Sequence, residues 1–193
     1  MRRNGTSGRI SQLSGLTVLC IISALTFGFY VSSVEAAPFA YVTGPSPFSP
    51  GSRSGTVSVF DTATNTVVAT ISVNGRPIGV AVTPDGKRAY MVIRSTAGGI
   101  VSVLDTATNT VVATVRVTDW FISGVAITPD GKHAYVTINN DTVKVLDTVT
   151  NTVVATVPEE NSIGVAITPN GKHAYVTTSD GVTVIDTAVV PIL

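Results

Sequence analysis

The sequence predicts an all-β fold assembled from repeats, because two Val/Thr-rich phrases recur along the chain with a period near 40 residues. One phrase, GVAVTPDGKRAY, occupies 79–90 and returns in close copies at 124–135 and 164–175. The other phrase, VSVFDTATNTVVAT, is found with small changes at 57–70, 101–114, 143–156 and, in part, 182–188. Apolar and polar residues alternate in both phrases, which is the pattern of strands and not of helices. Repeats of this length and pattern predict a β-propeller-like array of four-stranded antiparallel blades.

The second repeat shows why each strand begins and ends where it does. Its alternating runs predict four strands, a to d, over 78–83, 88–93, 100–105 and 110–117. Between strands a and b, Pro84 presets the backbone φ and Gly86 accepts a positive φ, so a tight hairpin is expected. Between strands c and d, the carboxylate of Asp105 can accept hydrogen bonds from the backbone, and Asn109 tolerates the left-handed conformation.

The repeats divide the chain after residue 36 into four blades, expected at 39–73, 78–117, 122–157 and 163–187. The first blade has no strand a, and the last has no strand d, because Pro191 in the segment that replaces it cannot supply a ladder N–H. Residues 37–193 therefore predict about three and a half blades in an open or partial ring, whereas closed propellers have about four to eight. Unpaired edges favour self-association. The break of the repeat in mid-phrase favours the alternative, a shortened piece of a longer propeller.

A Tyr-Val-Thr step lies in strand b at 41–43, 135–137 and 175–177, with 90–92 as a divergent copy. Together with the Thr-Pro-Asp-Gly-Lys and Asp-Thr-Ala-Thr-Asn-Thr phrases, this step resembles the YVTN family of β-propeller repeats over nearly the whole chain after residue 36. The resemblance implies a propeller fold in an extracytoplasmic or surface-layer type of protein, and it implies no particular chemistry. The last Asn of the family's step is replaced in every copy, so no role is transferred from it.

Residues 1–36 have the pattern of a secretory signal peptide. Arg2, Arg3 and Arg9 form a basic start, an apolar run covers 16–31, and small residues precede a cleavage site after Ala36. The alternative is an uncleaved membrane anchor. The run of 16 residues is shorter than the ~20 that span a bilayer, which favours cleavage. The body is therefore expected to be secreted, periplasmic or at the cell surface, without a stable membrane span.

Composition excludes several classes of function. The only cysteine is Cys20, inside the leader, so the body is not expected to hold a disulfide framework or a thiolate metal site. After cleavage the chain would carry nine Lys/Arg and eleven Asp/Glu, and this net charge of −2 does not favour nucleic-acid binding. His133 and His173 occupy the repeat position that Arg88 fills one blade earlier, as expected for a solvated rim and not for a ligand set. No catalytic residue, cofactor or metal is predicted.

Loops that repeat and loops that differ are expected on opposite faces of the array. The a–b and c–d turns are near copies, whereas the b–c loops and the d–a connections all differ in sequence. Non-repeated loops on a rigid frame are where binding residues usually lie. Trp120, the only tryptophan, is the most distinctive residue among them, with a plug over the junction of blades 2 and 3 as its alternative role. The candidate binding residues are Arg53, Arg76, Arg94, Asp119, Trp120, Phe121, Asn139, Glu159 and Glu160.

These observations predict a non-enzymatic, exported propeller-type repeat protein. Its non-repeated loops would bind a cell-envelope protein or glycan, or would support assembly at the cell surface. One alternative is a propeller domain associated with a redox enzyme, which would require cofactor ligands that the body does not offer in a converging set. The other alternative is a truncated fragment of a longer propeller without an independent function.

Overall fold

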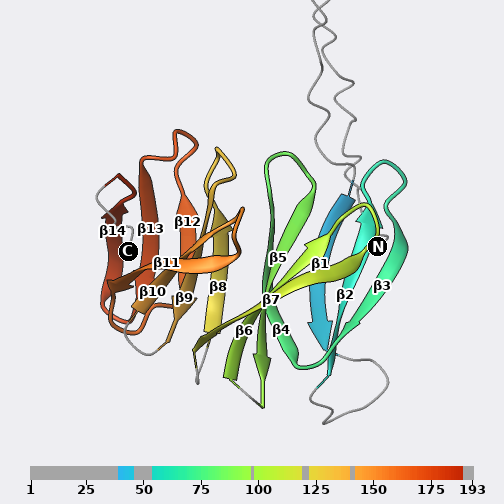
Figure 1. The fold of residues 1–193 in the computed structure, drawn as a ribbon, viewed down its shortest axis with the longest axis horizontal. Helices are drawn as coiled ribbons and strands as arrows, with labels where there is room; N and C mark the ends of the chain where they lie inside the picture. The colour runs from blue at the N-terminus through green and yellow to red at the C-terminus, as the bar shows by residue number, and fades with distance from the viewer. Residues whose placement is uncertain (1–38, 46–53, 97, 119–121, 140–141, 189–193) are drawn as a thin grey trace, which may run out of the picture. The chain divides into compact units, whose positions relative to one another are not determined.

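The computed structural model describes residues 39–45, 54–96, 98–118, 122–139 and 142–188, and every regular element in these ranges is a β-strand. Fourteen strands form four antiparallel sheets that follow one another along the chain (Figure 1). The prediction of an all-β, β-propeller-like array is confirmed. The leader, 1–36, lies outside the described residues.

Each sheet is one blade, whose strands pair in sequence order. Blade 1 contains β1 (Phe39–Pro45), β2 (Gly55–Asp61) and β3 (Thr66–Val73). Blade 2 contains β4 (Arg76–Val82), β5 (Arg88–Ser95), β6 (Gly98–Asp105) and β7 (Thr110–Thr118). Blade 3 contains β8 (Ile122–Ile127), β9 (His133–Ile138), β10 (Thr142–Asp147) and β11 (Thr152–Pro158). Blade 4 contains β12 (Gly164–Ile167), β13 (His173–Thr178) and β14 (Gly181–Asp186).

The ends of two strands in blade 2 differ from the sequence-based prediction. β4 begins at Arg76 and β5 continues to Ser95, so Arg76 and Arg94 lie in strands and not in the loops where they were expected. The reason is that these two residues pair across the ladder, beyond an irregularity in register between Pro77 and Gly79. The prediction that both arginines belong to loops was therefore wrong.

The a–b hairpins form as the sequence predicts. Gly86, Gly131 and Gly171 have φ values of 70°, 73° and 70°. In each hairpin the glycine N–H donates to the carbonyl of the Thr three residues before it, at 2.8 Å. The Thr83 hydroxyl also donates to Asp85 Oδ1 at 2.6 Å, and the Lys87 N–H donates to the same oxygen at 3.0 Å. The turn is thus fixed by its own local hydrogen bonds, which is why it can be copied from blade to blade.

The c–d turns are capped by the repeated aspartates. Asp105 Oδ1 accepts the backbone N–H groups of Ala107 and Thr108, both at 3.0 Å, and Asn109 adopts a φ of 55°. Hydrogen bonds from the backbone hold the pKa of Asp61, Asp105 and Asp147 below the usual range of the carboxyl group. In the a–b turns, hydrogen bonds from Thr83 and Thr128 lower the pKa of Asp85 and Asp130 in the same direction. These carboxylates therefore act as turn caps in their ionised form.

The first strands of blades 2, 3 and 4 contact one another in sequence, β4 with β8 and β8 with β12. Close approach requires small residues, and the Gly-Val-Ala sequence supplies them. A Cβ atom on Gly124 would lie 3.2 Å from the carbonyl oxygen of Ile163 and 3.1 Å from Thr137 Oγ1. This strand is therefore the place where neighbouring blades converge, as its small apolar composition predicts.

The hydrophobic core is divided among the three junctions between blades. The cluster at the first junction joins Tyr41, Val57 and Val59 of blade 1 to Met91 and Leu104 of blade 2. The clusters at the second and third junctions use the corresponding residues of the following blades. Blades 2 and 3 thus bury both of their apolar faces against neighbouring sheets, and blades 1 and 4 bury one face each, as in other repeat proteins.

We expect Gly131→Val to lower the free energy of unfolding by more than about 1 kcal/mol, because a β-branched side chain is strained at positive φ. Chemical denaturation of the two proteins measures the difference. The control is Lys132→Val at the exposed neighbouring position, which should change stability by less than about 0.5 kcal/mol. Equal effects of the two substitutions would contradict the assigned role of Gly131.

The stability of the fold should decrease in acid. A carboxyl group whose pKa is lower in the folded state contributes stability that is present above its unfolded pKa of about 3.9 and is lost as the pH falls through the folded pKa. Urea unfolding at a series of pH values from about 6 down to about 2 should show this loss. Asp105→Asn keeps one acceptor oxygen for the turn but does not titrate, so it should weaken the pH dependence. A stability that is constant over this interval would contradict the capping role.

Candidate functional site

The antiparallel order of strands places the two classes of loop at opposite ends of every blade. The a–b and c–d turns lie at the upper end in Figure 1, and the b–c turns and d–a connections lie at the other end. We call the first the repeated-turn face and the second the variable-loop face. Of the candidate binding residues, Arg53, Asp119, Trp120 and Phe121 lie outside the described residues. Arg76, Arg94, Asn139, Glu159 and Glu160 are described, and they belong to the variable-loop face.

Two of these residues form a basic pair in blade 2. Arg76 is exposed and lies opposite Arg94 on the neighbouring strand. Arg94 is half-buried, and its Nη2 atom donates to the carbonyl oxygen of Ile122 at 3.1 Å, which connects blade 2 to blade 3. Burial lowers the pKa of Arg94, and the positive charge of Arg76 lowers it further. Arg94 thus supports the junction, whereas Arg76 presents its charge to solvent.

Glu159 and Glu160 form an acidic pocket at the junction of blades 3 and 4. They line a cavity of about 510 Å³ together with Asp180 from the β13–β14 turn, and with Pro158, Thr178 and Thr183. Glu160 and Asp180 are exposed, and Glu159 is half-buried. Three carboxylates therefore surround one opening on the variable-loop face. Asp180 is not among the candidate binding residues that were predicted from the sequence.

The connection that carries the two glutamates is held by a residue that sequence reasoning missed. Ser162 is fully buried, and its hydroxyl lies 2.9 Å from the carbonyl oxygen of Ile138 and 3.1 Å from that of Thr142. Asn161, beside it, adopts a φ of 50°. A serine in a polar loop gives no sequence signal of such burial, because the carbonyl groups that it contacts come from another turn of the chain.

The structure thus separates the candidate residues into two groups. The basic pair lies in blade 2, and the acidic pocket lies between blades 3 and 4. Asn139 is exposed in the turn after β9 and lines neither feature. The variable-loop face therefore carries opposite charges at different blades, which suits recognition of an extended surface better than reaction at one point.

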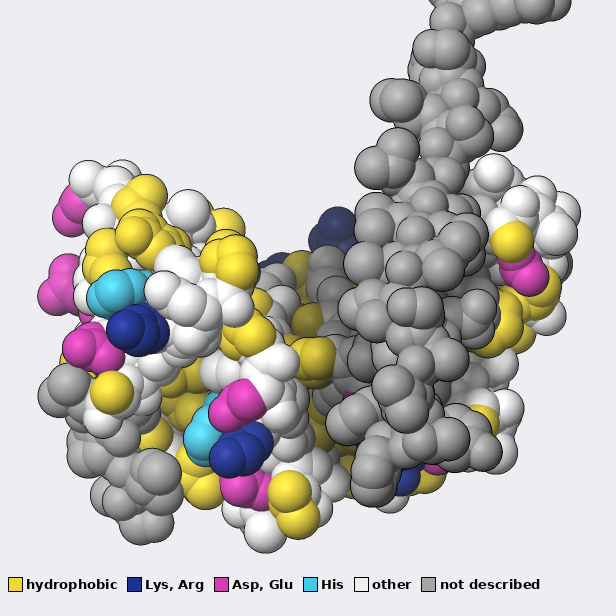
Figure 2. All heavy atoms as spheres, turned by 90° about the horizontal axis from the view of Figure 1, so that it is seen from above, with side chains coloured by type: hydrophobic (Ala, Val, Ile, Leu, Met, Phe, Trp, Pro, Cys, Tyr) yellow, Lys and Arg dark blue, Asp and Glu magenta, His cyan; other side chains and the backbone are white. Residues whose placement is uncertain are grey.

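The repeated-turn face carries histidines in a repeated setting. Figure 2 looks onto this face and shows two histidines, each near a basic and an acidic side chain. His133 pairs across the ladder with Asp147, and His173 pairs with Asp186, just as Arg88 pairs with Asp105 and forms an ion pair with it. Within the described residues, no group of three or more His, Cys, Asp or Glu side chains could hold a metal ion.

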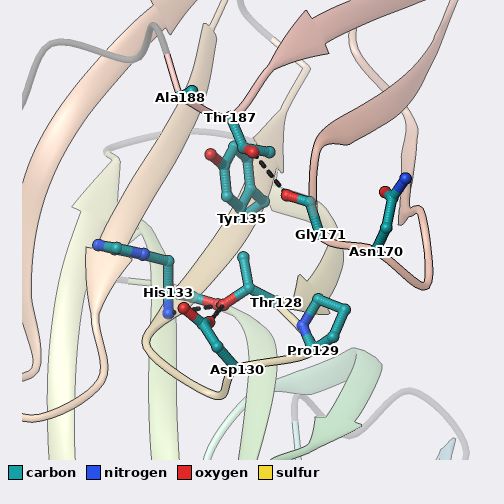
Figure 3. A pocket seen from close by; sticks show the side chains of 9 residues that line it. All are labelled: Thr128, Pro129, Asp130, His133, Tyr135, Asn170, Gly171, Thr187 and Ala188. Atoms are coloured by element: carbon teal, nitrogen blue, oxygen red, sulfur yellow. Dashed lines mark hydrogen bonds between the residues drawn. The ribbon is translucent and has the colours of Figure 1, made fainter.

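A second pocket, of about 470 Å³, opens on the repeated-turn face between blades 3 and 4 (Figure 3). Tyr135 lies at its centre, near Thr187 and Gly171, whose hydroxyl and carbonyl groups form a hydrogen bond of 2.5 Å. At the earlier junctions the corresponding tyrosine reaches an asparagine of the next c–d turn. Tyr41 donates to Asn109 Oδ1 at 3.4 Å, and Tyr90 lies 2.8 Å from Asn151 Oδ1.

The sequence accounts for the second pocket. In the register of the repeat, Val190 stands where Asn109 and Asn151 stand in the earlier c–d turns, and it lies outside the described residues. The described part of blade 4 ends at Ala188, on the wall of the pocket. This pocket is therefore a variation of the inter-blade junction, and the break in the Asp-Thr-Ala-Thr-Asn phrase is the sequence signal that could have indicated it.

Comparisons with known proteins support the fold. No protein-family model and no curated protein matches the chain. Among solved structures, the chain is similar to one described as Kuenenia stuttgartiensis hydrazine synthase, with a TM-score of 0.64 and 26% sequence identity. The similarity covers 88% of this chain and 51% of that one, so this chain spans about half of its length. Among the described residues, no helix is long and apolar enough to cross a bilayer.

Proposed function

We propose that this chain is an exported, non-catalytic propeller-type protein that binds a macromolecule of the cell envelope through its variable-loop face. The observation that carries the proposal is the contrast between the two faces. The repeated turns are fixed by their own hydrogen bonds in each blade, whereas the other face gathers an acidic pocket and a separate basic pair. Charged residues that differ from blade to blade on a rigid frame favour recognition of a partner over structural support alone.

The signal-peptide pattern of 1–36 and the resemblance to YVTN repeats favour the cell envelope as the place of action. The partner would be a protein or glycan that presents positive or hydrogen-bond-donating groups to Glu159, Glu160 and Asp180. Carboxylates accept hydrogen bonds from hydroxyl, amide and ammonium groups, and a row of them is suited to such a surface.

A second candidate function is that of a propeller domain associated with a redox enzyme. The similarity to hydrazine synthase, over about half of that chain, is the observation that favours it. In this case the array would serve as a frame for cofactor-bearing segments of a larger assembly. The described residues would bind those segments and would not take part in the redox reaction themselves. Spectra of the complex that the chain forms in the source organism would distinguish this candidate, because a redox cofactor on the partner segments absorbs light at wavelengths where this polypeptide does not.

The binding proposal predicts that Glu159→Gln combined with Glu160→Gln weakens association with envelope fractions of the source organism by about tenfold or more. The two substitutions remove charge with little change in size. Co-sedimentation of the purified chain with the fractions measures the effect. Trp120→Ala tests another of the candidate binding residues in the same assay.

The matched control is Lys132→Ala combined with Lys172→Ala on the repeated-turn face, where both side chains are exposed. This pair should leave association unchanged. A loss with the lysine pair and none with the glutamate pair would show that the wrong face was assigned. If no variant changes association with any envelope fraction, the chain acts as a fragment without this function.

A further inference from the structure

Every internal junction of the array is built from the same two apolar faces. The face toward the next blade, here called the trailing face, consists in blade 2 of Tyr90 on strand b and Val101 and Val103 on strand c. The face toward the preceding blade, here called the leading face, consists in blade 2 of Ala89 and Met91 on strand b and Leu104 on strand c. All six side chains have exposed fractions of 0%.

The trailing face of blade 4 carries the same residue types but is open. Tyr175, Val182 and Val184 occupy the positions of Tyr90, Val101 and Val103 in the repeat. Their exposed fractions are 44%, 61% and 50%. The hydroxyl group of the corresponding tyrosine in blade 2 bonds to an asparagine of the following blade. Blade 4 therefore presents to solvent the part of a junction that strands b and c supply.

The leading face of blade 1 presents the other half. Val42, which corresponds to Met91, has an exposed fraction of 50%, and Ala40 beside it is also exposed. Asn65 of the c–d turn is exposed, whereas its equivalents Asn109 and Asn151 are half-buried beneath the tyrosine of the preceding blade. Asn65 has the same φ of 55° as those two residues, so it is already in the conformation that receives the tyrosine.

We propose that these two faces bind each other between copies of this chain, so that blade 4 of one copy packs head-to-tail against blade 1 of the next. The Tyr175 hydroxyl donates to Asn65 of the neighbouring copy, and Val182 and Val184 cover the neighbour's Val42. The trailing face of blade 4 and the leading face of blade 1 are both exposed. At each of the three internal junctions a trailing face packs against a leading face of the same kind. Two copies would contain eight blades, within the range of about four to eight that closed propellers use.

A second copy explains the exposed residues better than an unrelated partner. Open apolar sheet faces are otherwise sites of indiscriminate pairing. An unrelated partner would need the tyrosine and asparagine positions of the repeat as well as its apolar pattern. Within the described residues, blade 1 has no first strand and blade 4 has no fourth strand, so the contact between copies is smaller than an internal junction. We therefore expect a reversible association that depends on protein concentration.

Two single substitutions test the proposal on the full chain. Val182→Lys places a charge on the trailing face, and Val42→Lys places one on the leading face. Both positions are at least half exposed, so each variant should fold, which circular dichroism would verify. Light scattering over a range of concentrations should show association of the unaltered chain and a monomer for either variant. The control is Val149→Lys, at a valine with an exposed fraction of 84% on neither face, which should associate like the unaltered chain.

Mixing the two variants gives the sharpest result. Each variant keeps one intact face, so an equimolar mixture should form a pair with one working junction, whereas neither variant alone can. A pair joined through two trailing faces would be abolished by Val182→Lys and unaffected by Val42→Lys, which would overturn the proposal. A monomeric unaltered chain would overturn it too. Association that persists in both variants would also overturn the proposal. Contacts through the apolar segment 16–31 would give that result.

Discussion

The structure depends on the junction between neighbouring blades. A single sheet of three or four short strands cannot bury its apolar residues by itself, and each one here does so against the sheets beside it. The tyrosine of strand b is central to each contact. Its ring lies in the apolar interface, and at the first two junctions its hydroxyl reaches a c–d turn of the next blade. Burial raises the pKa of Tyr90 to about 12, so this hydroxyl stays a hydrogen-bond donor at neutral pH.

This constraint explains why half of the molecule is copied and half is not. Residues that form junctions and turns must fit the same neighbours in each blade, so Asp105, Asn109 and Gly86 recur in nearly identical phrases. The variable-loop face has no such requirement. Its residues can therefore differ between blades, with a basic pair in blade 2 and an acidic pocket at the junction of blades 3 and 4. The sequence is repeated where residues must fit the same neighbours in every blade, and it diverges where they need not.

Local and repeated features could be predicted from the sequence. The positive φ of Gly86 and the capping by Asp105 follow from turn chemistry within five residues, and the blade follows from the period of the repeat. Features set by tertiary contact could not be predicted in this way. Arg94 was expected in a loop, but it extends β5 and reaches Ile122 of the next blade. Ser162 is buried only because carbonyl groups of another turn surround it.

The ends of the array show what happens where the junction has no second half. Tyr41, Tyr90 and Tyr135 have exposed fractions of 8%, 0% and 2%, whereas Tyr175 has 44%. The same residue type at the same repeat position is thus buried only where another described blade packs against it. The open faces of the array are therefore identified by the exposure of this tyrosine, since the residue type is the same in all four blades.

We infer that the tyrosine–asparagine contact couples one blade to the next. A double-mutant cycle with Tyr90→Phe and Asn151→Gly tests it directly, because glycine tolerates the φ of 55° at residue 151 while it removes the amide. The free energy of unfolding of the four proteins, measured by chemical denaturation, should give a coupling of about 0.5–1.5 kcal/mol for this contact. Additive effects of the two substitutions would contradict the claim.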